Sequence, residues 1–462
     1  MKKSTLIFLI FFIFTGIAYA NSQVTLTLHS DVDLGFIDSS IYKDATFEGG
    51  GFFQALISDK KKIKVTLKNK ENWRLLVEAT DVGKPLRFTK NILSNFYFEV
   101  DEGPWTKFSS LKNAVKVIQS DKEKERLEIE YKYQPDINDV PGSYKVKLYF
   151  QVQIYEENTW QPAASDTVRI FWHVKPWAIV KTRSEVNLGT IDASLYNKKE
   201  DKFSFLESTE ELGKVFVICN DPDGWNLEVS ANDVNYPGSF SLSLLKNFYW
   251  KVEDEVYRSG ENLDKIPAVV DRTKAQGKKV YQLRYRYLPS LNDTEGNYFI
   301  NLKYRLTSAN YQTMATDTTK ITWNVLKWTI FSSHGDIDLG VLDKSKISID
   351  SKGKLHFIPL KSLDNPLLVM SNSTRGWKVK LGISSFTTPL LFKGDLLKDF
   401  QWRLDKEKYQ SAERLYKKEA LVADEKKGPL KKTYYIDYRY LPDIDDIQGE
   451  YKITLKYTVY TK

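Results

Sequence analysis

Two short segments place histidine and aspartate at alternating positions, a pattern in which a β-strand could present metal ligands on one face. His29–Asp33 reads His-Ser-Asp-Val-Asp, and His334–Asp338 reads His-Gly-Asp-Ile-Asp. Alternate residues of a strand lie about 6.5 to 7 Å apart, too far for three side chains to reach one ion without further ligands. The middle of the chain has Arg183, Glu185 and Asn187 instead, which is typical of a charged, exposed edge. The sequence therefore predicts no metal-binding residues here.

Two acidic loops form a second candidate ion site. Asp136–Asp139 reads Asp-Ile-Asn-Asp and Asp443–Asp446 reads Asp-Ile-Asp-Asp, so each gathers oxygen ligands as calcium sites do. The related loop Ser290–Asp293 has one carboxylate fewer, and the chain lacks the twelve-residue EF-hand pattern. A turn in which aspartate accepts hydrogen bonds from its own backbone explains the same residues. We expect such turns, with calcium binding as the alternative.

Residues for catalysis are not found together in this sequence. There are four histidines, and the G-x-S-x-G, H-E-x-x-H and glycine-rich phosphate-binding patterns are absent. Cys219 is the single cysteine, which excludes an intramolecular disulfide and a cysteine-based zinc site. The sequence predicts no catalytic residue, no cofactor and no enzymatic activity.

The first twenty residues predict export. Lys2 and Lys3 precede the apolar run Leu6–Ile17, and Ala18–Ala20 has the small-x-small form that signal peptidase cuts. We expect residues 1–20 to be removed, with a retained N-terminal anchor as the alternative. No later stretch is apolar over 18 residues, so no transmembrane segment is expected after cleavage. The mature protein is expected in the periplasm, on the cell surface or outside the cell.

Composition is that of a folded protein with a mild basic excess. The chain has 462 residues, of which 42% are hydrophobic, and its formal net charge of +8 is spread along the sequence rather than clustered. Such a distribution does not predict nucleic-acid binding. An envelope protein or a glycan, of unknown identity, is the expected partner.

Four motifs recur three times in one order, at spacings of 151 to 154 residues, so the chain is a tandem triplication. The predicted domains are residues 21–175, 176–327 and 328–462. The copies are Asp33–Asp38, Asn187–Asp192 and Asp338–Asp343; Trp73–Leu75, Trp225–Leu227 and Trp377–Val379; Phe96–Phe98, Phe248–Trp250 and Phe400–Trp402; and Tyr131–Pro135, Tyr285–Pro289 and Tyr438–Pro442.

Within each repeat the apolar residues alternate with period 2, which predicts strands with one buried face. About eight such strands in about 150 residues favour two antiparallel sheets packed face to face, an all-β, immunoglobulin-like sandwich. The repeat-specific stretches are expected to hold short strands at residues 114–118, 268–270 and 420–422. Since Trp177 follows the end of the first repeat after two residues, the three sandwiches are expected to form a semi-rigid array.

Repeats one and two each end in a closing strand, at Asp166–Val174 and Asp317–Val325. Repeat three ends soon after the strand that begins at Tyr451, so it is expected to lack this strand. An unpaired edge can accept a strand from a partner. The alternative is that the chain itself covers the edge.

The tryptophans divide into two groups. Trp73, Trp225 and Trp377 share a register with aliphatic residues and are expected in the core, whereas Trp105 and Trp160 lie in variable loops and could form a carbohydrate platform.

A further pattern links the acidic loops to a known turn. In each repeat the loop aspartate is followed by a glycine and then a tyrosine, as in Asp139, Gly142 and Tyr144, which resembles the tyrosine corner of immunoglobulin-like sandwiches. With the L-G-x-I/L, G/N-W-x-L/V and G-x-Y-x-V/I motifs, each repeat resembles the sandwich modules of bacterial exported surface proteins, including fimbrial-type and WxL-type domains. WxL-type proteins would imply cell-wall attachment, but their second W-x-L motif is missing.

This resemblance implies an exported, non-enzymatic envelope or surface protein that acts as a spacer, adhesion or interaction rod. A carbohydrate- or peptidoglycan-binding array and a subunit of a donor-strand-exchanged polymer are the alternatives.

Overall fold

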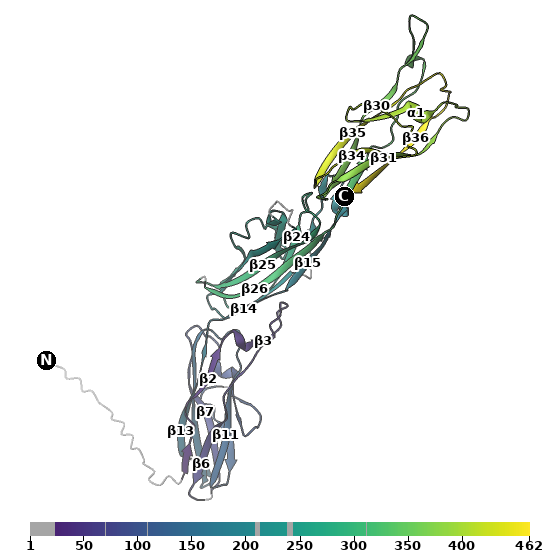
Figure 1. The fold of residues 1–462 in the computed structure, drawn as a ribbon. Coiled ribbons are helices and arrows are strands. Elements are labelled where there is room, and N and C mark those ends of the chain that lie inside the picture. Colours follow the sequence, from purple (N-terminus) through teal and green to yellow (C-terminus); the bar gives the residue numbers. More distant parts are fainter. Residues whose placement is uncertain (1–23, 70, 109, 208–212, 238–243, 311) are drawn as a thin grey trace, which may run out of the picture.

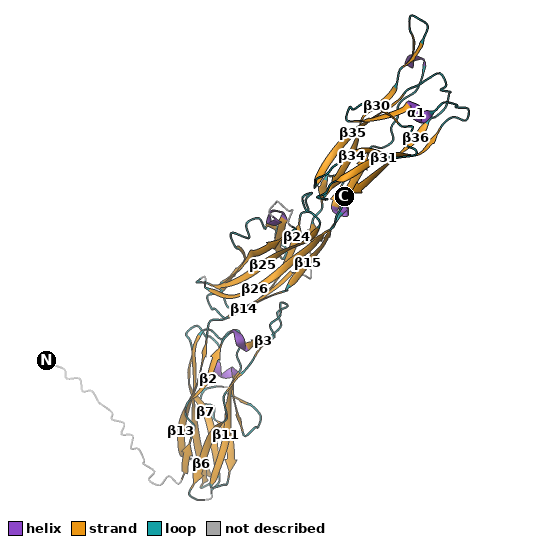
Figure 2. Ribbon diagram, in the orientation of Figure 1, coloured by secondary structure: helices purple, strands orange, loops and turns teal. Residues whose placement is uncertain are grey.

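The computed structural model describes residues 24–69, 71–108, 110–207, 213–237, 244–310 and 312–462. The predicted signal peptide lies outside these residues. Strands dominate the described chain, and its helices are single turns (Figure 2). They are α1 (Leu396–Asp399) and the 3-10 turns Ser39–Ile41, Ile92–Asn95, Ala193–Leu195, Leu244–Asn247 and Lys344–Lys346.

The first stretch, the N-terminal sandwich, has two sheets that enclose one core. Sheet one has the order β1 (Val24–Thr27), β6 (Lys61–Leu67), β11 (Lys124–Tyr133), β8 (Phe96–Val100) and β9 (Thr106–Lys107), with β5 (Leu56–Ile57) paired to β11. Sheet two has the order β10 (Val115–Ser120), β7 (Trp73–Gly83), β12 (Gly142–Glu156), β13 (Thr159–Val174) and β2 (Val32–Ile37).

The middle sandwich repeats this topology around its own core. Sheet one has the order β14 (Ala178–Thr182), β19 (Gly213–Cys219), β24 (Gly277–Tyr287), β21 (Phe248–Val252) and β22 (Arg258–Ser259), with β18 (Leu206–Glu207) paired to β24. Sheet two has the order β15 (Glu185–Ile191), β26 (Thr313–Val325), β25 (Gly296–Ser308), β20 (Trp225–Asn235) and β23 (Ala268–Thr273).

The C-terminal sandwich keeps sheet one but has a shorter sheet two. Sheet one has the order β27 (Thr329–Ser333), β30 (Leu360–Ser371), β35 (Leu430–Tyr440), β32 (Phe400–Leu404) and β33 (Gln410–Ser411). Sheet two has only β34 (Ala420–Asp424), β31 (Trp377–Thr387) and β36 (Lys452–Thr461).

Each sandwich also carries a small hairpin. The hairpins are β3 (Tyr42–Lys43) with β4 (Phe52–Phe53), β16 (Tyr196–Asn197) with β17 (Lys202–Phe203), and β28 (Ile347–Ile349) with β29 (Leu355–Phe357).

These sheets confirm the predicted fold class of multiple all-β sandwiches. The three short strands expected in the variable stretches are present as β10, β23 and β34. Figure 1 shows the sandwiches arranged end to end. The division of the chain into three domains with boundaries after residues 175 and 327 stays a prediction.

The core residues follow the alternation that the sequence predicts. Trp73, Trp225 and Trp377 are buried, as expected, and none is more than 4% exposed. The tyrosine corner is also present in each sandwich, because the strand-opening tyrosine donates its hydroxyl proton to a backbone carbonyl four residues earlier. These bonds run from Tyr144 to Val140 (2.9 Å), from Tyr298 to Thr294 (2.8 Å) and from Tyr451 to Ile447 (2.9 Å).

One asparagine side chain holds each joint between neighbouring sandwiches. The Asn220 side chain accepts a hydrogen bond from the Trp177 backbone N–H (2.8 Å) and donates to the carbonyls of Lys175 (3.0 Å) and Asp139 (3.3 Å). Asn220 is fully buried. Its amide therefore binds the corner of one sandwich, the linker and the residue that precedes the first strand of the next sandwich.

The second joint repeats this arrangement. The Asn372 side chain accepts from the Trp328 backbone N–H (2.8 Å) and donates to the carbonyls of Leu326 (2.8 Å) and Asp293 (3.1 Å). Each buried side-chain amide donates and accepts hydrogen bonds on both sides of a joint, and this favours one orientation between neighbouring sandwiches.

Candidate functional site

The outer edge of β36 is open. In the described part of the chain β36 pairs only with β31, so one row of its backbone N–H and C=O groups has no strand beside it. The related strands β12 and β25 each pair on both sides. Among the described residues no closing strand lies beside β36, and the absence of that strand from the last repeat stays a prediction.

The side chains of β36 show the consequence for packing. Four inward-facing residues of β36 are only half-buried, whereas the corresponding residues of β25 are at most 1% exposed. An apolar strip is thus left partly open to water along this edge. The residues of β36 are Ile453, Leu455, Tyr457 and Val459, and those of β25 are Ile300, Leu302, Tyr304 and Leu306.

A closing-strand tryptophan fills the centre of this position in the complete sandwiches. Trp172 of β13 is fully buried, with its ring centroid 4.3 Å from that of Tyr133 and 5.6 Å from that of Tyr144. Trp323 of β26 lies in the same way between two tyrosines, 4.6 and 5.8 Å away.

The C-terminal sandwich has the same two tyrosines but no closing strand. Tyr440 and Tyr451 lie with ring centroids 6.3 Å apart, and Tyr451 is half-buried. We call the position beside Tyr440 and Tyr451 the tryptophan slot.

A second strand is missing from the same sheet. In the complete sandwiches β2 and β15 are edge strands that pair, in parallel, with the closing strands β13 and β26. Residues 336–342 carry the related motif but form no strand. In the complete sandwiches the closing strand lies between β12 and β2 and between β25 and β15, so by analogy a strand added beside β36 would pair on its other side with residues 336–342.

The histidine and aspartate side chains of the first candidate ion site bind separate partners. The Nε2 atom of His29 lies 2.9 Å from the Tyr131 hydroxyl, while the Asp31 carboxylate binds Arg169 at 2.7 Å. The Asp33 carboxylate accepts from the Gly35 N–H (2.8 Å). His334 repeats the contact through Tyr438 at 3.0 Å. Burial lowers the pKa of His29, which favours the neutral ring.

The acidic loops use their carboxylates within the corner. The two Asp139 carboxylate oxygens accept from the Tyr133 hydroxyl (2.6 Å) and from the Asp136 N–H (2.9 Å), and Asp139 is 1% exposed. Asp293 makes the same pair of bonds. Burial raises the pKa of Asp139 to about 7 and that of Asp293 to about 6. These turns match the expected Asx-type turn, and no group of three or more metal-ligating side chains occurs among the described residues.

The two loop tryptophans are less open than the sequence suggests. Trp105 and Trp160 are half-buried, and each ring has a cation over one face. The Lys132 ammonium lies 4.2 Å from the Trp105 ring centroid, and the Arg74 guanidinium lies 4.4 Å from that of Trp160. These contacts compete with stacking of a sugar on that face.

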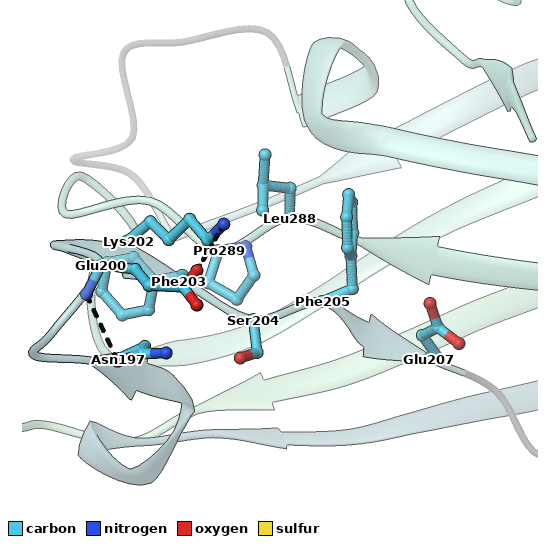
Figure 3. Close-up of a pocket in the computed structure, with 9 residues that line it drawn as sticks. All are labelled: Asn197, Glu200, Lys202, Phe203, Ser204, Phe205, Glu207, Leu288 and Pro289. Carbon is cyan, nitrogen blue, oxygen red and sulfur yellow. Dashed lines mark hydrogen bonds and ion pairs between the residues drawn. The ribbon is translucent and has the colours of Figure 1, made fainter.

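A depression of about 690 Å³ lies beside the β16–β17 hairpin. Figure 3 shows Phe205, Leu288 and Pro289 along it, with Lys202 paired to Glu200 at its rim. The Arg286 guanidinium lies 3.8 Å from the Phe205 ring centroid, so this ring is also covered on one side. The lining also includes Asn197, Ser204 and Glu207, while Lys202 and Glu200 neutralise each other.

No family model and no curated protein matches the sequence. Solved structures similar to this chain include fimbrial tip adhesins and pilus subunits. The CupB6 tip adhesin from Pseudomonas aeruginosa is 10% identical, with 66% of this chain and 99% of that chain covered and a TM-score of 0.29. The chaperone–tip subunit complex of Csu pili from Acinetobacter baumannii is 10% identical, with 61% and 99% covered and a TM-score of 0.31.

The CfaE adhesin of enterotoxigenic E. coli is also similar, with 8% identity, 67% and 89% of the two chains covered, and a TM-score of 0.25. TM-scores this low leave the function to be argued from the residues of this chain. In the described residues no helix is long and apolar enough to cross a membrane.

Sequence reasoning located the open edge but missed two parts of the site. The tryptophan slot follows from Trp172 and Trp323, which occur at the same place in the first two closing strands. The loss of strand structure at residues 336–342 has no local signal, because the motif is intact.

Proposed function

We propose that this protein is an exported, non-enzymatic rod of the bacterial envelope or surface, and that it joins a partner by accepting a β-strand at its C-terminal sandwich. The open edge of β36, with its half-buried apolar strip and tryptophan slot, carries this proposal. Strand addition would satisfy the backbone groups of the edge and bury the strip in one step.

The complete sandwiches specify the chemistry of the donor strand. In the middle sandwich the inward residues of β26 are Ile321, Trp323 and Val325, and all are at most 3% exposed. β26 runs antiparallel to β25 and parallel to β15. The donor is therefore a strand with alternating β-branched residues and one central tryptophan, and it runs antiparallel to β36.

The rigid joints support the role of a rod. Each joint buries an asparagine that binds both neighbouring sandwiches, and Arg87 also pairs with Asp223 across the first joint at 2.6 Å. An array of this kind would hold the open edge at a fixed distance from the N-terminal sandwich.

A synthetic peptide that copies residues 317–326 tests strand acceptance. Added to the full chain, it is expected to slow amide hydrogen exchange in β36 and residues 336–342 and to leave β25 unchanged. The matched control is the same peptide with Ile321, Trp323 and Val325 replaced by serine, which should have no effect. Unchanged exchange in β36 at saturating peptide concentration would refute the proposal.

A further inference from the structure

The distal end of each sandwich, defined as the end that carries the small hairpin and the acidic corner, presents three apolar positions. In the N-terminal sandwich these are Tyr42 and Phe53 of the hairpin and Ile137 of the corner, and in the middle sandwich they are Tyr196, Phe203 and Leu291. The hairpin residues pair across the hairpin in both cases. We call this set the distal surface.

At both joints the next sandwich covers the distal surface with the same kinds of residue. Trp177 and Phe216 pack on the first distal surface, with Phe53 and Trp177 ring centroids 5.9 Å apart. Trp328 and Met370 pack on the second, with Phe203 and Trp328 centroids 5.5 Å apart.

Polar contacts complete each joint. The asparagine described above binds the carbonyl of the corner aspartate, and a carboxylate in the hairpin loop approaches a lysine of the next sandwich. Glu48 lies 3.6 Å from Lys214 at the first joint, and Asp201 lies within 2.6 Å of Lys431 at the second.

The C-terminal sandwich has a third distal surface that nothing in the described chain covers. Its three positions are Ile347 and Phe357, which pair across the hairpin, and Ile444 in the corner. Ile347 is 37% exposed and Ile444 is 73% exposed, whereas Tyr42 and Tyr196 are at most 9% exposed. Figure 1 shows this end of the array standing free. The positions stay apolar although water reaches them.

The charges of this end differ from those of the two joints. The hairpin carboxylate Asp350 accepts from the backbone N–H groups of Lys352 (2.8 Å) and Lys354 (3.0 Å) and lies 3.0 Å from His356 Nε2. The carboxylate is thus used within the hairpin, and the exposed ends of Lys352 and Lys354 lie at its tip. A surface that fits here would carry carboxylates where the two joints have Lys214 and Lys431.

We propose that the distal surface of the C-terminal sandwich binds the end of a β-sandwich in a different protein, and that this end carries a tryptophan, an asparagine and carboxylates. The tryptophan covers Ile347, Phe357 and Ile444, the asparagine donates to the carbonyl of Asp446, and the carboxylates pair with the hairpin lysines. This surface is distinct from the open edge of β36, and the proposal does not depend on strand addition.

A second copy of this chain does not fit the surface. At the positions of Phe216, Ile218 and Asn220 the N-terminal sandwich has Lys64, Thr66 and Lys68, and both lysines are exposed. Lys64 would place a charge on the apolar positions, and Lys68 supplies no asparagine to bind the corner. Lys62 and Lys124 stand at the positions of Lys214 and Lys431, so they would face Lys352 and Lys354 and repel them.

The same contrast provides the test. Five substitutions give the N-terminal sandwich of the full chain a matching end. Lys64→Phe, Thr66→Ile and Lys68→Asn introduce the residues of the first joint, and Lys124→Glu introduces a carboxylate. Gln23→Trp adds the tryptophan, because Gln23 precedes Leu34 in the sequence by eleven residues, as Trp177 precedes Leu188. We expect this variant to form concentration-dependent head-to-tail species in sedimentation velocity, while the wild type stays monomeric in the same concentration range.

Adding Ile444→Lys to that variant should abolish the association, since it places a charge in the centre of the distal surface. Far-ultraviolet circular dichroism and the melting temperature check that each variant folds. The proposal would be overturned if the association survived Ile444→Lys. It would also be overturned if the folded five-substitution variant remained monomeric at a concentration 100-fold above the lowest one measured. Self-association of the wild type through Ile444 would overturn the assignment to a different protein.

Discussion

The middle and C-terminal sandwiches carry the same four motifs, yet their second sheets have five strands and three strands. In the middle sandwich β26 lies between β25 and β15, and β15 has no other neighbour in the sheet. The C-terminal sandwich has no strand after β36, and residues 336–342 do not form the strand related to β15. In the middle sandwich one closing strand thus pairs with two strands that lie far apart in the sequence.

The comparison also shows what the closing strand contributes to packing. The inward face of β25 is buried by β26, whereas the same face of β36 is half-exposed although its residues are equally apolar. Apolar residues of the kind found in a core are typical, when they lie at an open edge, of a surface that becomes buried when a partner binds.

The largest expected effect comes from making the middle sandwich resemble the C-terminal one. Trp323→Ala removes the ring between Tyr287 and Tyr298 and should cost about 3 to 5 kcal/mol of unfolding free energy. Hydrogen exchange measured by mass spectrometry should become faster in β25 and β26 and stay unchanged in β36. Trp160→Ala, at a half-buried position, is the matched control and should leave all three strands unaffected. Exchange in β25 at the wild-type rate would contradict the role given to Trp323.

The reverse change should repair the C-terminal sandwich. A copy of residues 309–325 added after Lys462 supplies the missing turn and closing strand. Completing the burial of Ile453, Leu455, Tyr457 and Val459 should stabilise this sandwich by about 3 kcal/mol. Differential scanning calorimetry should show one transition moved to higher temperature. An extension with its inward residues replaced by serine should leave the temperature of this transition unchanged. If that extension raised the transition temperature equally, the tryptophan slot would not be the source of the stabilisation.

The joint between the two compared sandwiches gives a smaller effect. Asn372→Ala leaves the Trp328 N–H and the carbonyls of Leu326 and Asp293 without their side-chain partner, which should cost about 2 kcal/mol. Small-angle X-ray scattering should then report a broader distribution of shapes. Lys68→Ala, at the equivalent exposed position of the N-terminal sandwich, should change neither property. An unchanged scattering profile for Asn372→Ala would show that the joint does not depend on this amide.

Much of this architecture could be predicted from the sequence because the signals are local. Period 2 alternation and the recurrence of Trp73, Trp225 and Trp377 locate the strands and the core. The corners could be predicted because the aspartate, glycine and tyrosine lie within six residues.

The other features depend on residues far apart in the sequence. The motif at residues 338–343 is intact although no strand forms there, and the related strands β2 and β15 each pair with a closing strand more than 100 residues later. The joint asparagines are single residues in variable loops. Their signal is an asparagine five residues before the repeat tryptophan in two of three copies, with Lys68 in the third.

The smallest expected effect is the difference between the two complete corners in how their stability responds to pH. Burial raises the pKa of Asp139 to about 7 and that of Asp293 to about 6, while an aspartate in the unfolded chain titrates near about 4. The folded protein therefore holds protons that the unfolded chain has released. This contribution to stability is fully present below about pH 4 and is lost as the pH rises through each folded pKa.

Unfolding free energy should accordingly fall by about 1 kcal/mol per pH unit for each carboxyl inside its window. Asp139→Asn should flatten the decline between pH 6 and pH 7, whereas Asp293→Asn should flatten it only below pH 6. Urea unfolding of the two variants and the wild type at pH 5, 6, 7 and 8 measures both slopes. Equal slopes in all three proteins would show that Asp139 and Asp293 are charged in the folded state across this range, and that the hydrogen bonds from Tyr133 and Tyr287 outweigh burial at both corners.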